Sequence, residues 1–131
     1  MTDVLLATDS DEVFAAVDSA LADNTTTVYR VKQGQHVLPV VEEKLPDLVI
    51  LDLQIGNMGG VAACLMIRQE EGMDRLPRRP IALLLDRDAD SFLAQESRAD
   101  GWLVKPLDPL RLRRLAKTLL EKGTLFEGSI S

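Results

Sequence analysis

The strongest structural signal in this chain is the stretch Pro46-Asp47-Leu48-Val49-Ile50-Leu51-Asp52-Leu53-Gln54-Ile55-Gly56-Asn57-Met58-Gly59-Gly60. It consists of a short apolar run, one aspartate (Asp52) directly after it, and then a glycine-rich loop. Such a run, opened by Pro-Asp and closed by glycine and asparagine, is typical of a strand that is covered on both faces of a parallel sheet. Sites in open α/β sheets form beyond the carboxyl ends of such strands, so Asp52 is the first candidate for a functional residue.

An aspartate at the end of a buried strand costs free energy unless a metal ion, a lysine or hydrogen bonds stabilise its charge. Asp52 therefore either belongs to a polar site or simply faces water at the end of the strand. This segment alone leaves both interpretations open.

The composition indicates one domain with a real hydrophobic core. The chain has 131 residues, 46% of them hydrophobic, and a formal net charge of −6. We expect residues 1–123 to form the domain and residues 124–131 a C-terminal tail. The negative charge argues against binding to nucleic acid, because phosphate contacts need clustered lysine and arginine. Cys64 and His36 are the only residues of their types, so any metal must be held by oxygen ligands.

Membrane and secretion signals are also missing from the pattern. No apolar run approaches the roughly 20 residues that span a bilayer, and the first residues lack a basic leader. We therefore expect a cytoplasmic protein that makes no contact with a membrane.

The remaining sequence alternates short apolar runs with helical patterns. Strands are predicted near residues 4–7, 25–31, 48–52, 81–85 and 101–104, and helices near 13–21, 36–44, 61–71, 86–98 and 109–122. This alternation predicts an α/β fold in which a doubly wound, five-stranded parallel sheet has right-handed crossovers. In the flavodoxin-like order 2-1-3-4-5, the ends of strands one, three and five would bring Asp9, Asp52 and Lys105 together.

With these residues in place, the chain resembles the receiver domains of bacterial two-component response regulators over nearly its whole length. The resemblance is carried by Asp9 after strand one, the motif Pro-Asp-Leu-Val-Ile-Leu-Asp that ends at Asp52, and Gly60 after the loop. It is also carried by the motif Ala99-Asp100-Gly101-Trp102-Leu103-Val104-Lys105-Pro106.

The resemblance implies a role for each residue of the site. Asp52 would accept a phosphoryl group from a histidine kinase or a phosphotransfer protein, and Lys105 would contact that group. Mg²⁺ would bind at Asp9, Asp52 and the backbone carbonyl of Gln54, and the Lys105-Pro106 peptide would be cis. The chemistry supports these roles, because phosphoryl transfer depends mainly on positioning and on the neutralisation of charge.

Two positions depart from the family pattern. Receivers usually carry two adjacent acids after strand one, but here the first is Thr8, so we expect weak binding of Mg²⁺. At the end of strand four the family places a Ser or Thr hydroxyl that bonds the phosphoryl group, whereas this chain has Leu85 followed by Asp86. The residue that aligns with this Ser or Thr is either Leu85 or Asp86, and neither side chain has a hydroxyl. Trp102 stands where the family has a switch aromatic, so we expect Leu85 and Trp102 to form a weakened switch.

Three further residues have ordinary structural interpretations. Asp11 is predicted to cap the first helix rather than to assist a metal through water. Cys64 is predicted to be a buried, unreactive thiol, and His36 a surface side chain.

Two functions from this family remain open. The first is a stand-alone receiver that is phosphorylated on Asp52 and signals through protein contacts, on the face formed by helix four, strand five and helix five, or as a homodimer. The second is a pseudo-receiver, whose partner binding does not depend on phosphorylation. Asp9, Asp52 and Lys105 favour the first function, whereas Thr8 and Leu85 favour the second.

Neither function is enzymatic, and two other classes fit poorly. A phosphatase of the haloacid dehalogenase type needs a second acid two residues after its nucleophile, and that position is Gln54. A flavin-binding protein needs Ser, Thr or Gly residues in the first loop to hold a phosphate, and this loop lacks such a run. We therefore expect no cofactor other than weakly bound Mg²⁺.

Overall fold

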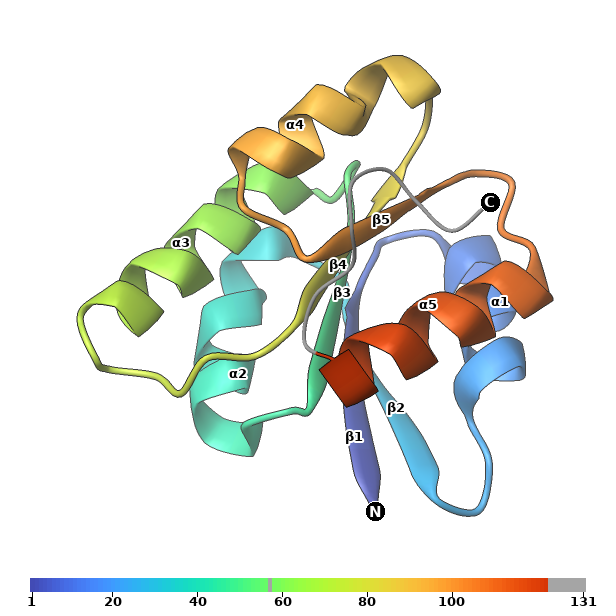
Figure 1. Ribbon diagram of the computed structural model, residues 1–131, viewed down its shortest axis with the longest axis horizontal. Helices are drawn as coiled ribbons and strands as arrows, with labels where there is room; N and C mark the ends of the chain where they lie inside the picture. Colours follow the sequence, from blue (N-terminus) through green and yellow to red (C-terminus); the bar gives the residue numbers. More distant parts are fainter. Residues whose placement is uncertain (57, 123–131) are drawn as a thin grey trace.

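The computed structural model describes residues 1–56 and 58–122. Five parallel strands in this part of the chain form one sheet in the order β2-β1-β3-β4-β5, with helices on both faces (Figure 1). The elements are β1 (Thr2–Ala7), α1 (Asp11–Leu21), β2 (Thr26–Val31), the 3-10 helix η1 (Gly34–His36), α2 (Val37–Lys44), β3 (Leu48–Asp52), α3 (Gly60–Gly72), β4 (Ile81–Leu85), the 3-10 helix η2 (Asp88–Asp90), α4 (Ser91–Glu96), β5 (Gly101–Val104) and α5 (Pro109–Lys122). The predicted fold and strand order are confirmed, whereas the predicted tail lies outside the described residues.

The fourth helical region differs from its prediction. The sequence pattern predicts one helix over residues 86–98, but the structure has η2 followed by the short helix α4. Arg87 has extended backbone angles, and Arg98 adopts a positive φ of 62° after the helix. Both ends of the predicted helix are therefore non-helical, and Asp86 stays at the end of β4.

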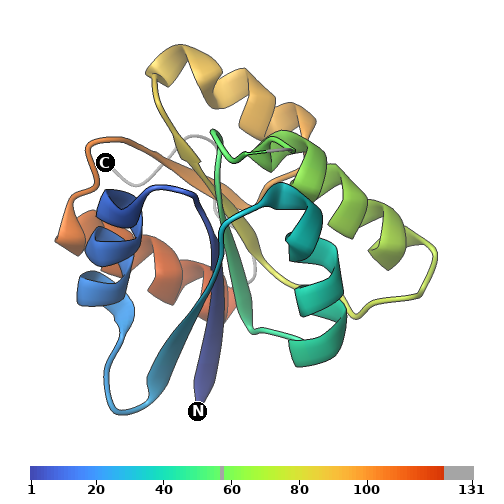
Figure 2. The ribbon, with the colours of Figure 1, turned by 180° about the vertical axis from the view of Figure 1, so that it is seen from behind.

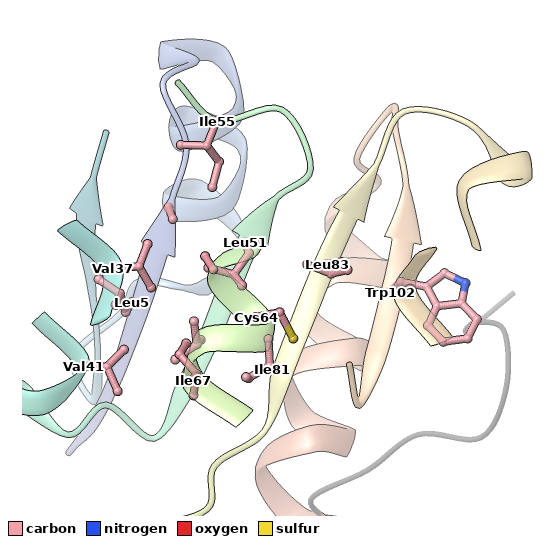
Figure 3. Close-up of a cluster of buried hydrophobic side chains, with 14 of the residues drawn as sticks. Leu5, Val37, Val41, Leu51, Ile55, Cys64, Ile67, Ile81, Leu83 and Trp102 are labelled. Carbon is pink, nitrogen blue, oxygen red and sulfur yellow. The ribbon is translucent and has the colours of Figure 1, made fainter. Parts of the chain in front are cut away.

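The sheet separates two hydrophobic clusters. One lies under α2, α3 and α4 and is drawn in Figure 3, and the other lies under α1 and α5, which share one face of the sheet (Figures 1 and 2). Val49 and Leu51 of β3 belong to the first cluster, and Leu48 and Ile50 belong to the second. All five residues of β3 are buried, as the continuous apolar run predicts.

Side-chain alternation decides which strand-end residues can meet. Successive side chains of a strand point to opposite faces, so residues two apart share a face. Leu6, Ile50, Leu84 and Leu103 all lie in the cluster under α1 and α5. The residues two positions further along these four chain segments are Thr8, Asp52, Asp86 and Lys105. The alternation therefore directs these four side chains to one face at one edge of the sheet.

Among the described residues, no helix is both long and apolar enough to cross a membrane.

Candidate functional site

Asp52 is buried at the end of β3, and both of its carboxylate oxygens are hydrogen-bonded. Its exposed fraction is 1%. Oδ2 accepts a hydrogen bond from Thr8 Oγ1 at 2.7 Å, and Oδ1 accepts from Lys105 Nζ at 2.7 Å and from the backbone N–H of Gln54 at 3.3 Å. The interpretation of Asp52 as a water-facing aspartate is therefore wrong, and its charge is stabilised by a built polar site.

Thr8 connects Asp52 to the start of α1. Its fully buried hydroxyl also accepts a hydrogen bond from the backbone N–H of Ser10 at 3.1 Å. The side chain of Ser10 in turn accepts from the backbone N–H of Val13 at 3.1 Å, which makes Ser10 the N-cap of α1. This chain of hydrogen bonds fixes the first turn of α1 relative to Asp52.

The predicted capping role of Asp11 is wrong, because Ser10 fills it. Asp11 is the first residue of α1, and its exposed carboxylate accepts from Arg30 Nη1 at 2.8 Å. This hydrogen bond and the charge of Arg30 lower the pKa of the Asp11 carboxyl. Arg30 Nε also donates to the backbone carbonyl of Thr8 at 3.1 Å, so β2 helps to hold the end of β1.

Asp9 lies beside the loop that follows Asp52. Its exposed side chain accepts a hydrogen bond from the backbone N–H of Gly56 at 3.1 Å. The same loop returns so closely that a Cβ on Gly60 would lie 2.5 Å from the backbone oxygen of Asp52. Gly60 is therefore required by a close backbone approach, and the loop is held next to the two aspartates.

Lys105 follows β5, and its side chain reaches Asp52 as the strand order predicts. Its backbone N–H donates to the carbonyl of Leu85 at 2.8 Å, and its peptide bond to Pro106 is cis, as predicted. Its Nζ donates to Asp52 Oδ1 and also to Asp86 Oδ1, the latter at 3.0 Å. Burial acts to lower the pKa of Lys105, but hydrogen bonds and charges from the two aspartates outweigh burial and raise it. Lys105 therefore carries its positive charge at neutral pH.

The structure corrects the expected place of Leu85. Its side chain is fully buried in the cluster under α2, α3 and α4, on the opposite face of the sheet from Asp52. Trp102 belongs to the same cluster (Figure 3). The residue of this strand end that reaches the site is Asp86, because alternation returns the side chain after Leu85 to the face of Asp52. The one-residue ambiguity in the sequence is thereby resolved in favour of Asp86.

The arrangement offers a hard cation a limited set of oxygen donors. Asp9 and Asp52 stand at the ends of neighbouring strands, and Gln54 lies in the loop beside them. Within residues 1–56 and 58–122, no group of three or more Asp, Glu, His or Cys side chains is placed as it would be around a metal ion. Mg²⁺ usually keeps several waters and uses only one or two carboxylates. These donors therefore fit a Mg²⁺ ion that is held mainly by water.

Comparison with known proteins identifies one family. A family model described as "Response regulator receiver domain" matches residues 4–117. The transcriptional regulatory protein AfsQ1 of Streptomyces coelicolor is 30% identical over 125 residues, which cover 94% of this chain and 53% of that protein. The DNA-binding response regulator MtrA of Mycobacterium tuberculosis is 33% identical over 116 residues, which cover 81% of this chain and 48% of that protein. The chain thus spans about half the length of the curated relatives it matches.

Solved structures show the same fold. The chemotaxis response regulator CheY4 of Vibrio cholerae has a TM-score of 0.80 at 24% identity and covers 91% of this chain and 98% of its own. The receiver domain of NtrX from Brucella abortus has a TM-score of 0.79 at 21% identity and covers 92% of this chain and 99% of its own. At these identities the likeness establishes the fold alone.

Proposed function

The chain belongs to the response regulator receiver domain family of two-component systems, and from this premise we propose that Asp52 is its phosphoacceptor. The observation that carries the proposal is the buried carboxylate of Asp52 at 2.7 Å from the ammonium of Lys105. A carboxylate nucleophile needs a cation beside it, because both the nucleophile and the phosphodonor are negatively charged. The family is a signalling module, and we propose no catalytic turnover for this chain.

The transfer is a displacement at phosphorus. A carboxylate oxygen of Asp52 forms a bond to the phosphorus of a phosphohistidine, and the phosphorus–nitrogen bond of the donor breaks. The imidazole leaves with the electron pair of that bond and takes up a proton. Lys105 is a compact point charge that neutralises charge on the transferred oxygens. Thr8 and the backbone of Gln54 orient the carboxylate before transfer.

Receiver domains typically bind Mg²⁺ at an acidic pocket. In this chain Asp9, Asp52 and the backbone carbonyl of Gln54 would hold the ion, which would supply further neutralisation of charge when bound. Thr8 stands where the family usually has an acid, so one carboxylate fewer is available after β1. We therefore propose that the affinity for Mg²⁺ is low.

We propose that the domain exchanges phosphoryl groups with a histidine kinase or a phosphotransfer protein. It would signal through contacts on the face of α4, β5 and α5, with a partner protein or with a second copy. Phe92 of α4 and Leu110 of α5 are apolar side chains on two of these elements that a partner would cover, because they are 59% and 63% exposed. The absence of nucleic acid binding and a cytoplasmic location stay predictions, since matched relatives are named as DNA-binding or transcriptional regulators.

A specific observation favours the pseudo-receiver as the second candidate. Thr8 and Lys105 already donate hydrogen bonds to the two carboxylate oxygens of Asp52, and Lys105 also donates one to Asp86. A site so completely paired can be structural, with a partner that binds whether or not Asp52 is modified.

Intact-mass measurement separates the two functions. The protein is incubated with acetyl phosphate or phosphoramidate in the presence of Mg²⁺, and a phosphoryl adduct is expected on the natural chain. The matched control is Asp52→Asn, which keeps the shape of the side chain and should lose the adduct. Circular dichroism checks that the variant is folded. An unmodified natural chain with every donor tested would favour the pseudo-receiver.

A further inference from the structure

Two carboxylates share the ammonium group of Lys105. Its Nζ lies 2.7 Å from Asp52 Oδ1 and 3.0 Å from Asp86 Oδ1, so two of its three N–H donors are engaged. The two acids differ in environment, since the side chain of Asp52 is 2% exposed and that of Asp86 is 36% exposed. The pair with Asp86 is thus the one that water screens more, and it is the weaker of the two.

The contact with Asp86 follows from the register of β4 and β5. Leu85 is paired with Val104, so Asp86 and Lys105 occupy the next positions of the two neighbouring chain segments. Asp86 is also the first residue of the segment that leads to η2 and α4. Whatever changes the contact between Asp86 and Lys105 therefore acts directly on the start of this segment.

Phosphorylation would add negative charge where one lysine already faces two carboxylates. The acyl phosphate would remove the single charge of the Asp52 carboxylate but add a phosphoryl group with a charge of roughly −1.5 to −2. The new oxygens would attract Lys105 and repel Asp86. Because Asp86 forms the more exposed pair, it is the partner that Lys105 would lose.

We propose that Asp86 is a positioning residue that competes with the phosphoryl group for Lys105, so that phosphorylation of Asp52 releases Asp86. This inference rests on the proposed function of Asp52. Before transfer, Asp86 restrains Lys105 and repels the anionic donor, which slows phosphorylation. After transfer, the freed Asp86 changes the chain at the start of the segment before α4.

Three variants test the competition. Asp86→Asn keeps the shape of the side chain and removes its charge, and Asp86→Glu keeps the charge. Asp88→Asn is the matched control, because it removes an exposed acid from the same segment. The initial rate of modification by acetyl phosphate, followed by intact mass, should rise about two- to fivefold in Asp86→Asn, the range expected for an exposed ion pair. Asp86→Glu should restore a rate near that of the natural chain, and Asp88→Asn should stay within about 1.5-fold of it.

Amide NMR gives a readout that a merely structural role would not move. On addition of beryllofluoride, a phosphoryl mimic, the amides of residues 86–88 should shift in the natural chain and much less in Asp86→Asn. Equal phosphorylation rates and equal amide responses in the natural chain and in Asp86→Asn would overturn the proposed competition for Lys105, while leaving Asp52 as phosphoacceptor. A lack of any adduct on every variant would overturn the proposed function and this inference together.

Discussion

The buried hydroxyl of Thr8 donates a hydrogen bond of 2.7 Å to Oδ2 of Asp52. Receivers usually have an acid at the position of Thr8 and a hydroxyl at the end of strand four, where this chain directs Asp86 toward Lys105. Relative to the family pattern, the hydroxyl therefore follows β1 and the acid follows β4, so the site keeps both kinds of group at exchanged positions. The consequence is that metal binding and switching should differ from the family pattern more than the phosphoacceptor itself does.

The hydrogen bond from Thr8 should contribute measurably to stability. Thr8→Val keeps the shape of the side chain but leaves Asp52 Oδ2 without its donor and Ser10 N–H without its acceptor. A hydrogen bond to a charged group is worth about 1.5–3 kcal/mol, so the free energy of unfolding should fall by about that amount. Urea unfolding followed by circular dichroism measures the change. Thr27→Val on the edge strand β2 is the control and should change stability by less than about 0.5 kcal/mol.

Thr8 should also limit the affinity for Mg²⁺. Thr8→Asp adds a carboxylate beside Asp52, and one additional charged ligand should tighten binding about tenfold or more. Isothermal titration calorimetry is the suitable measurement, because Trp102 lies on the opposite face of the sheet and is a poor reporter of the site. Asp9→Asn should weaken binding in both backgrounds. Tight binding by the natural chain, or an unchanged affinity in Thr8→Asp, would contradict this account of the metal site.

A buried ion-pair network around Asp100 stabilises the edge of the sheet opposite the candidate site, where β4 and β5 begin. Asp100 accepts from Arg78 Nη2 at 2.6 Å, from the backbone N–H of Ile81 at 2.8 Å, and from the buried guanidinium of Arg68. Asp100→Ala removes one of the two buried carboxylates that pair with Arg68, leaving Glu71 as the other, and it leaves the backbone N–H of Ile81 without its acceptor. This change should cost about 2–4 kcal/mol of stability. Urea unfolding tests this value, with Arg75→Gln in an exposed pair as the control. A loss of under about 1 kcal/mol in Asp100→Ala, similar to the control, would show that the network is not stabilising.

Cys64 should react slowly in the folded protein. Burial raises the pKa of its thiol from the usual 9.0 to about 11, and its Sγ donates to the carbonyl of Ser97 at 3.2 Å. At pH 8 the thiolate fraction should be roughly a hundredfold lower than in the unfolded chain, and labelling by Ellman's reagent should be slowed at least as much. Because the pKa of the Cys64 thiol is higher in the folded than in the unfolded chain, the protonated thiol favours the folded state. This contribution to the free energy of unfolding is present below pH 9 and is lost as the pH rises toward 11. Rapid, complete labelling of the native protein at pH 8 would contradict the burial of Cys64.

The strand order and the contact between Asp52 and Lys105 could be predicted from the sequence for a simple physical reason. A continuous apolar run specifies a buried central strand, and the carboxyl ends of parallel strands share one edge. The backbones of residues that directly follow such runs must then lie near one another, whatever contacts their side chains make.

The contacts of Thr8 and Asp86 could not be predicted in this way. Sequence comparison counts Thr8 only as a missing acid, whereas its hydroxyl binds Asp52 directly. The place of Asp86 depends on which face the last residue of β4 occupies, and a run of consecutive leucines carries no alternation that would show it. The observed register, in which Asp52 of β3 pairs with Leu84 of β4, places the side chain of Asp86 on the face of Asp52.

The coupling between Asp52 and the face of α4, β5 and α5 is the property in which Asp86 should matter most. A ligand shifts an equilibrium only through its different interactions with the two states. Asp86 can be released by a phosphoryl group, but it cannot donate a hydrogen bond to one while it is ionised. Beryllofluoride should therefore perturb residues 86–88 of the natural chain and change the amide shifts of the rest of this face only slightly.

Asp86→Thr should enlarge that response, because its hydroxyl would stand on the face of Asp52. A charge-assisted hydrogen bond of about 1.5–3 kcal/mol corresponds to a population shift of roughly tenfold to a hundredfold. Leu85→Thr is the matched control. It puts a hydroxyl into the fully buried apolar cluster on the opposite face, so it should lower stability by about 1–3 kcal/mol without enlarging the response. Natural-chain shifts as large and as widespread as those of Asp86→Thr would show that the coupling follows a route independent of this position.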